Sequence, residues 1–198
     1  MPVKEICAGL SAVLILVAGP PYALDTLKGV TKPERMTWFI FSLLGVVAFV
    51  SQAGLGASWS LLFSGLDTAG SCLMLLLSLK YGVGGYARRD IVALVIALAG
   101  IAAAYLFRQP LISLTGVIVA DASGTALTVR KAFLDPGSET TITWLCVGTA
   151  AVFGMLAVGS WSLSLLLYPA YLVVANYAVP TAQLLGRPKR RVQVSKAL

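Results

Sequence analysis

Seven apolar runs, separated by short polar connections, account for most of the chain. A bilayer core about 30 Å thick requires about 20 apolar residues in a helix, so the runs predict seven transmembrane helices. The predicted spans are Ile6–Leu24, Met36–Gly54, Ser58–Leu79, Ile91–Phe107, Leu111–Val129, Ile142–Ser160 and Ser162–Leu185. Because the connections are short, they leave no room for a soluble domain, and we expect an all-α membrane protein.

The composition agrees with this fold class and excludes several functions. Apolar residues make up 58% of the 198 positions and charged residues only 12%, against about 25% charged in soluble domains. The net charge of +7 does not indicate nucleic-acid binding, because the basic residues stand beside apolar runs instead of forming one patch. There is no histidine and the three cysteines are far apart. We therefore expect no enzyme, no metal site and no cofactor.

The positions of Lys and Arg predict the orientation. With the N-terminus outside, 13 of these 15 residues fall in inner loops and the C-terminal tail, and only Lys4 and Arg108 lie outside. The alternative for the first run is a cleaved signal peptide with Lys4 ahead of it. Glu5 cancels that charge and no clear small-x-small cleavage site follows, so we favour a retained first helix.

Three landmarks recur in the same order in the two halves of the chain. Lys28 and Pro33 correspond to Lys131 and Pro136. The pairs Thr37-Trp38 and Thr143-Trp144 open the second and sixth runs, and Trp59-Ser60-Leu61 and Trp161-Ser162-Leu163 the third and seventh. The offsets are 103, 106 and 102 residues. The repeat predicts two parallel three-helix bundles joined by a linker helix. The corresponding segments are 1–84, the linker helix 85–109, 110–186, and a basic cytoplasmic tail over 187–198.

With this layout, the Lys-x4-Pro turn and the following Thr-Trp resemble the PQ-loop superfamily, which includes the SWEET sugar transporters and, by fold, the KDEL receptors. Pro20-Pro21-Tyr22 stands where the first Pro-Gln of that superfamily would lie. The resemblance implies a 3+1+3 helix fold that transports a small solute. It also implies that Asn176, on the seventh run, contributes to the solute pocket.

Two acidic residues lie deep within predicted spans. Asp67 and Asp121 both stand about ten residues into helices that enter from outside, so both carboxyl groups are expected near the bilayer midplane. A buried acid there is costly unless it faces a cavity or a partner. We interpret both as proton-coupling residues of a solute site. The alternative is a protonated Asp that bonds to a neighbouring helix.

Polar residues at helical spacing lie on the same helix face as Asp67 and as Asp121, so each helix carries a polar stripe. Ser64 and Ser71 flank Asp67, and Thr125 follows Asp121 by one turn. The remaining candidates for the cavity are Ser42 and Gln52 on the second run and Tyr168 and Tyr171 on the seventh. The alternative for these stripes is a polar seam between helices. We interpret all four tryptophans, Trp38, Trp59, Trp144 and Trp161, as members of an interfacial aromatic belt.

We therefore expect an alternating-access transporter of a small polar solute in a bacterial inner membrane. The alternative is a seven-helix receptor or sensor that binds its ligand in the same cavity. A third hypothesis, an intramembrane aspartyl hydrolase, needs two carboxyl groups about 3 Å apart. The expected partners are the solute and anionic lipid at the basic tail, with no nucleic acid, and homo-oligomerisation is left open.

Overall fold

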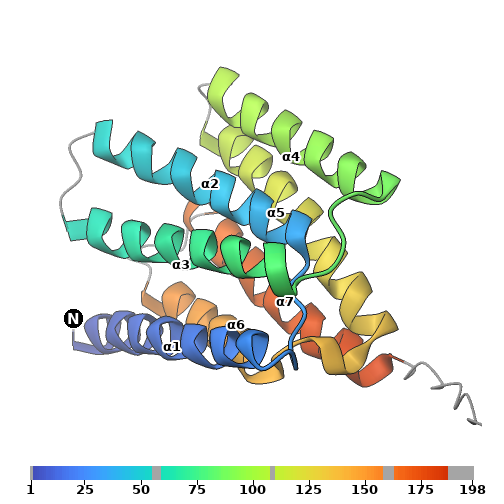
Figure 1. Ribbon diagram of the computed structural model, residues 1–198. Helices are drawn as coiled ribbons and strands as arrows, with labels where there is room; N and C mark the ends of the chain where they lie inside the picture. Colours follow the sequence, from blue (N-terminus) through green and yellow to red (C-terminus); the bar gives the residue numbers. More distant parts are fainter. Residues whose placement is uncertain (1, 55–58, 108–109, 158–162, 187–198) are drawn as a thin grey trace, which may run out of the picture.

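A computed structural model describes residues 2–54, 59–107, 110–157 and 163–186. Over these residues the chain forms seven α-helices and one short 3-10 helix, η1 (Figure 1). The elements are α1 (Pro2–Leu27), α2 (Arg35–Gly54), α3 (Trp59–Tyr81), α4 (Arg88–Leu106), α5 (Pro110–Leu134), η1 (Pro136–Ser138), α6 (Thr141–Ala157) and α7 (Leu163–Leu185). Each helix coincides with one predicted run to within a few residues, and the all-helical fold class is confirmed.

Three of the helices are long and apolar enough to cross a membrane. They are Val3–Leu27, Arg88–Leu106 and Leu111–Leu134. The described parts of three others, Arg35–Val47, Thr68–Tyr81 and Thr141–Ala157, are apolar but shorter. Many large apolar side chains are exposed on the outer surface, Leu16, Val95 and Leu156 among them. Such a surface is compatible with a membrane protein.

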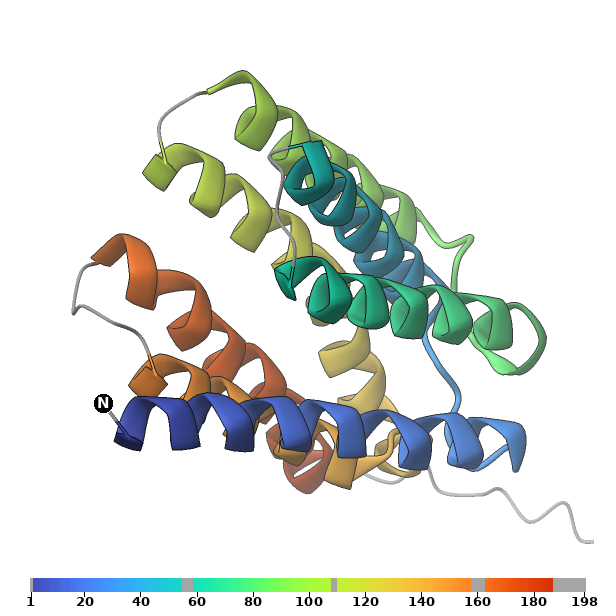
Figure 2. The same cartoon turned by 90° about the vertical axis from the view of Figure 1, so that its left-hand side faces the viewer.

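The packing order places the third helix of each sequence repeat between the first and the second. α3 contacts both α1 and α2, and α7 contacts both α5 and α6. The two sets of helices meet where α1 packs on α6 and where α2 packs on α5. α4 lies along α5 and also contacts α2 (Figure 2).

α4 and α5 cross at two glycines. A Cβ atom built on Gly100 would lie 2.4 Å from the backbone oxygen of Gly116, and a Cβ on Gly116 would lie 2.4 Å from that of Gly100. Only glycine permits so close an approach of two backbones. Ala97 and Ala120, each fully buried, belong to the core cluster of the same two helices.

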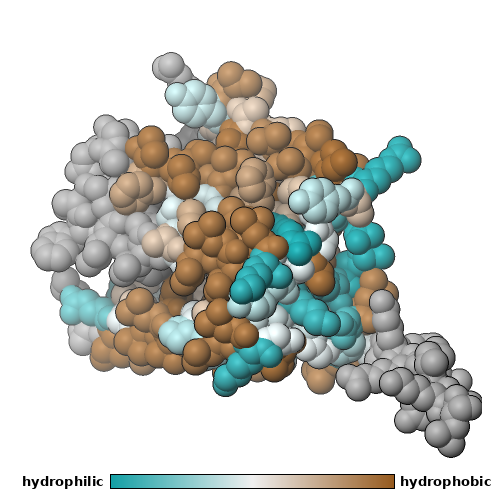
Figure 3. Space-filling view, in the orientation of Figure 1, coloured by the Kyte–Doolittle hydropathy of each residue, from teal (hydrophilic) through white to brown (hydrophobic). Residues whose placement is uncertain are grey.

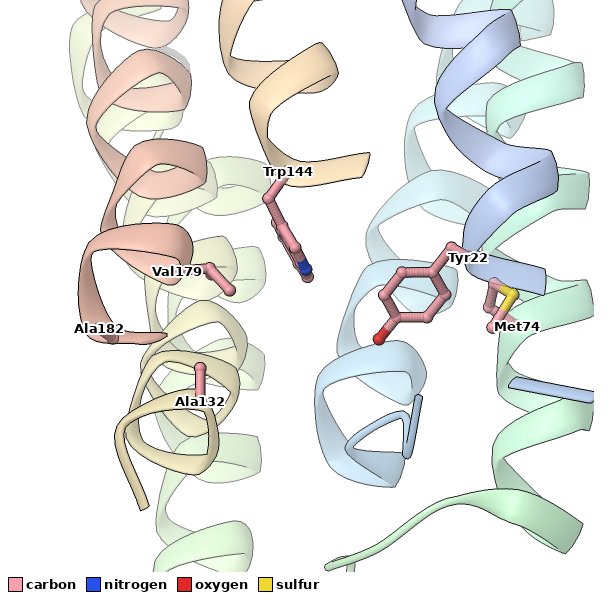
Figure 4. Packing of buried hydrophobic residues seen from close by; sticks show 6 residues of the cluster. All are labelled: Tyr22, Met74, Ala132, Trp144, Val179 and Ala182. Carbon is pink, nitrogen blue, oxygen red and sulfur yellow. The ribbon is translucent and has the colours of Figure 1, made fainter. Parts of the chain in front are cut away.

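An aromatic cluster centres on Tyr22, which is 1% exposed. Trp38 and Trp144 both make edge contacts with its ring, at centroid distances of 5.3 Å and 6.2 Å. Figure 4 shows Tyr22 and Trp144 between α1 and α6, with Met74 and Val179 in the same cluster. The belt interpretation of these two tryptophans was wrong, because Trp144 is buried and Trp38 packs against the core. Each reaches inward to the same tyrosine.

Hydrophilic side chains gather at one end of the molecule, where residues 28–34, 82–87 and 135–140 connect the helices (Figure 3). We call this the polar end. α1 stops here because Gly29 adopts a left-handed φ of 74° and the Val30 amide donates to the carbonyl of Asp25. α2 begins here at Arg35, directly after Glu34, whose side-chain oxygen Oε2 accepts the amide N–H of Thr37 at 2.8 Å. Capping therefore ends one helix and starts the next within seven residues.

Candidate functional site

Asp121 and Tyr171 join the middles of α5 and α7. The Tyr171 hydroxyl donates to Asp121 Oδ2 at 2.5 Å, and the Thr125 hydroxyl donates to the same oxygen at 3.3 Å. An O–H···O distance of 2.5 Å is at the short end of the range for such hydrogen bonds. All three residues were predicted cavity residues, and the structure brings them together across two helices. The arrangement can bind a proton or a polar solute group at Asp121.

The other described candidates lie on α7, α2 and α3. The Tyr168 ring stands 6.2 Å from that of Tyr171. Asn176 is buried, and its amide donates to the Leu172 carbonyl within α7. Ser42 is buried and donates to the Trp38 carbonyl within α2. Ser71 is half-buried on α3.

Three predicted residues lie outside the part of the chain whose side chains the structure describes: Gln52, Ser64 and Asp67. The distance between the Asp67 and Asp121 carboxyl groups would distinguish a hydrolase from a solute cavity. Because the Asp67 side chain lies outside the described residues, both hypotheses stay predictions. Over the described residues, no group of three or more His, Cys, Asp or Glu gathers in a way that could hold a metal ion.

The loops of the two repeats bond to each other at the polar end. The hydroxyl oxygens of Thr31 and Thr140 lie 2.5 Å apart, and Thr140 also donates to Asp25 Oδ2 at 2.9 Å. The Lys32 amide donates to the Ser138 carbonyl at 3.0 Å. Because Thr31 and Thr140 are both buried, these bonds exclude water and close the polar end.

Lys131 adds a charged side chain to the contacts between these two loops. Its ammonium group donates to the carbonyl of Lys32 and forms an ion pair with Glu139, whose side chain is fully buried. The other carboxylate oxygen of Glu139 accepts the indole N–H of Trp144 at 2.8 Å. A buried carboxylate requires such partners to offset its loss of hydration. Lys131 therefore holds both loops through one side chain.

Glu34 is the second buried glutamate of the polar end and is 4% exposed. Its Oε2 accepts the amide of Thr37 and lies 3.2 Å from the Thr37 hydroxyl oxygen. Burial raises the pKa of its carboxyl group, and the nearby charge of Asp90 raises it further. The hydrogen bonds from Thr37 and the positive charge of Lys131 lower that pKa, but burial dominates.

Sequence reasoning missed this polar end, although the repeat contained the signal. Glu34 precedes Trp38 by four residues, and Glu139 precedes Trp144 by five. Both glutamates lie in a loop that follows a Lys and a Pro landmark. An acid that recurs in corresponding loops of two repeats, next to an apolar helix, indicates a buried role.

No protein-family model, curated protein or solved structure matches this chain.

Proposed function

We propose that this protein is a membrane transporter that moves a small polar solute by alternating access. The observation that carries the proposal is the contact between Asp121 and Tyr171, halfway along two helices that are otherwise mostly apolar. A carboxyl group held at the middle of a membrane helix is costly, so such groups mark solute or proton pathways. The tyrosine hydroxyl offers a donor that a solute can replace.

The helix packing supports two bundles that move relative to each other. Both repeats place their third helix in the centre, and the interfaces α1–α6 and α2–α5 correspond to each other under the repeat. Such internal symmetry allows one bundle to rock against the other around a central site. We therefore propose that all seven helices span the membrane, with α4 as the linker.

The polar end supports the predicted orientation. The basic residues Lys28, Lys32, Arg88 and Arg89 belong to or flank the loops of this end, and positive loops face the cytoplasm. We propose that the polar end is cytoplasmic, that the N-terminus lies outside, and that the membrane is a bacterial inner membrane. The bonds between the two loops then represent a closed cytoplasmic side.

In the proposed mechanism, a solute enters from the outer side and replaces Tyr171 as the partner of Asp121. The bonds at the polar end then break, and the solute leaves to the cytoplasm. A site that is exposed to only one side at a time prevents leakage of solute. The hydrogen bonds between the two loops are worth about 1 kcal/mol each, and the Lys131–Glu139 ion pair lies within the second repeat, so binding of one solute provides enough free energy to shift the balance.

The test is uptake by purified protein in liposomes, across a panel of sugars, amino acids and vitamins, with and without an inward proton gradient. Asp121→Asn and Asp67→Asn are compared with Asp135→Asn, a control at an exposed residue. Loss of gradient-stimulated uptake in Asp121→Asn, with normal uptake in the control, supports the proposal. Tyr171→Phe is expected to change the apparent affinity about tenfold, since it removes a bond to a carboxyl group.

Uptake of no solute by the wild-type protein would overturn the proposal. If a solute then still raised the melting temperature, the result would favour the receptor hypothesis, in which the same cavity binds a ligand and does not release it across the membrane.

A further inference from the structure

Glu34 is buried at the polar end and has no ion-pair partner among the described residues. The adjacent Arg35 donates to the carbonyl oxygens of Ser78 and Gly84, both at 3.0 Å. The loop that carries Gly84 closes over the carboxylate, because a Cβ atom on Gly84 would lie 1.7 Å from Glu34 Oε1. With φ at +76°, Gly84 adopts a conformation that other residues rarely take. Glu34 is thus enclosed by backbone instead of by cations.

Counting protons around Thr37 indicates the charge state of Glu34. The Thr37 hydroxyl oxygen has three neighbours: the Gly124 carbonyl oxygen at 2.7 Å, the Thr128 hydroxyl at 3.0 Å and Glu34 Oε2 at 3.2 Å. A carbonyl oxygen can only accept, so the single Thr37 proton points to Gly124, the shortest contact, while Thr128 donates to Thr37. An ionised Glu34 would then face an oxygen with no proton to offer. A protonated Glu34 supplies the missing proton.

The hydrogen bonds of Thr37 depend on whether Glu34 is protonated or ionised. When Glu34 is ionised, its negative charge attracts the Thr37 proton, and the Gly124 carbonyl of α5 loses its donor. Gly124 and Thr37 belong to α5 and α2, one of the two interfaces between the repeats. Loss of the Glu34 proton therefore weakens the α2–α5 contact, and gain of the proton restores it.

The charged and titratable groups around Glu34 come from four elements. Asp90 at the start of α4 and Lys131 on α5 act on its charge. Tyr22 on α1 interacts electrostatically with Glu34. Arg35 on α2 donates its hydrogen bonds to backbone carbonyl oxygens. Asp90 is itself held by the amides of Gly85 and Ala87 and by Arg89. Burial and the charge of Asp90 favour the neutral form of Glu34. Lys131 is the cation that favours the ionised form.

We propose that Glu34 is a proton-binding residue that holds a proton while α2 and α5 are joined and releases it to the cytoplasm when the polar end opens. The release step rests on the proposed transport function, whereas the bound proton does not. On α5, Thr125 and Thr128 lie one and two turns from Asp121, so a change at Thr37 reaches the helix that carries the solute site. The proton would couple solute movement to the proton gradient.

Infrared spectroscopy of the reconstituted protein tests the bound proton directly. The chain contains only three glutamates, Glu5, Glu34 and Glu139, so labelling glutamate with carbon-13 isolates their carbonyl bands. Glu5 is exposed and Glu139 is paired with Lys131. We expect a protonated glutamic acid band that persists above the ordinary glutamate pKa of about 4.3 and that is absent in Glu34→Gln. The control Glu5→Gln should keep the band.

Transport tests the coupling. Glu34→Gln mimics the protonated residue, so it should exchange solute across the membrane without a gradient but lose stimulation by a proton gradient. Thr37→Val should lose the same stimulation while keeping the protonated band, because it removes only the hydroxyl that links Glu34 to α5. Glu5→Gln should retain full stimulation.

Each outcome decides one part of the proposal. A glutamate band that titrates near the ordinary value in the wild-type protein would overturn the bound proton, and this result needs no variant. A band that survives in Glu34→Gln would overturn it as well. Full gradient stimulation in Glu34→Gln would overturn the coupling. If the wild-type protein transports nothing, the transport proposal and the coupling role fail together, and the infrared band alone then decides whether Glu34 binds a proton.

Discussion

The hydroxyl oxygens of Thr31 and Thr140 lie 2.5 Å apart, although 109 positions separate the two residues in the chain. Thr31 lies in the loop after α1 and Thr140 in the loop before α6, so the contact joins the corresponding loops of the two repeats. Neither residue is exposed. If the polar end opens during transport, these two oxygens must separate.

A disulfide at this contact should lock the polar end. Replacing Thr31 and Thr140 by Cys, in a chain whose three native cysteines are replaced by Ala, should allow rapid cross-linking on oxidation, because disulfides need neighbouring Cβ atoms. We expect uptake to stop on oxidation and to return on reduction. Liposome uptake before and after reductant measures this. Undiminished uptake by the fully cross-linked protein would show that the polar end does not open.

Loss of Lys131 should destabilise the protein by leaving a buried charge unpaired. The Glu139 side chain is fully buried, and Lys131 is its ion-pair partner. Breaking a buried pair costs roughly 3 kcal/mol or more. We expect Lys131→Met to lower the free energy of unfolding by about that amount, measured by denaturation in detergent micelles. The matched control Lys28→Met, at an exposed lysine, should change it little.

The double variant Lys131→Met/Glu139→Gln separates charge from packing. Because it removes the uncompensated carboxylate as well, its loss of stability should be smaller than that of Lys131→Met alone. A double variant that is less stable than the single one would contradict the ion-pair explanation.

The α4–α5 crossing should not tolerate a methyl group. In Gly100→Ala, the new Cβ would meet the backbone oxygen of Gly116 at 2.4 Å, and backbone cannot move as a side chain can. We expect a loss of about 1–3 kcal/mol, typical of overpacking, measured as a lower melting temperature. Gly70→Ala is the control, since nothing lies within 4 Å of its Cβ position. Equal melting temperatures for the two variants would argue against the crossing.

The raised pKa of Glu34 predicts how stability depends on pH. Its carboxyl group has a higher pKa in the folded protein than in the unfolded chain, so the folded state binds the proton more tightly. The stabilisation that this provides is complete below the unfolded value of about 4.3 and is lost as the pH rises through the folded value. The free energy of unfolding of the wild-type protein should therefore fall over this range relative to Glu34→Gln.

Denaturation at a series of pH values measures the difference between the two proteins, and Glu5→Gln supplies the control. Each unit between the folded and unfolded pKa contributes about 1.4 kcal/mol. Parallel pH profiles for the wild-type protein and Glu34→Gln would exclude a shifted pKa at Glu34.

The pattern of apolar residues determined the helices of this protein by itself. Runs of about 20 apolar residues satisfy their backbone hydrogen bonds internally, so each run forms a helix regardless of its neighbours. The repeat of Lys, Pro, Thr and Trp also indicated which segments correspond. Asp121, Thr125 and Tyr171 were identified as candidate residues, because a polar side chain within an apolar run is conspicuous.

Which side chains meet was decided only by the tertiary structure. Helical spacing puts Asp121 and Thr125 on one face, but the bond from Tyr171 depends on how α7 packs against α5. Glu34 and Glu139 stand in short loops and read as ordinary hydrated charges. Glu34 becomes buried because the loop that carries Gly84 closes over it, and Glu139 lies where two loops more than 100 residues apart in sequence fold against each other. Contacts of this kind depend on the arrangement of the whole chain, and no local pattern of residues encodes them.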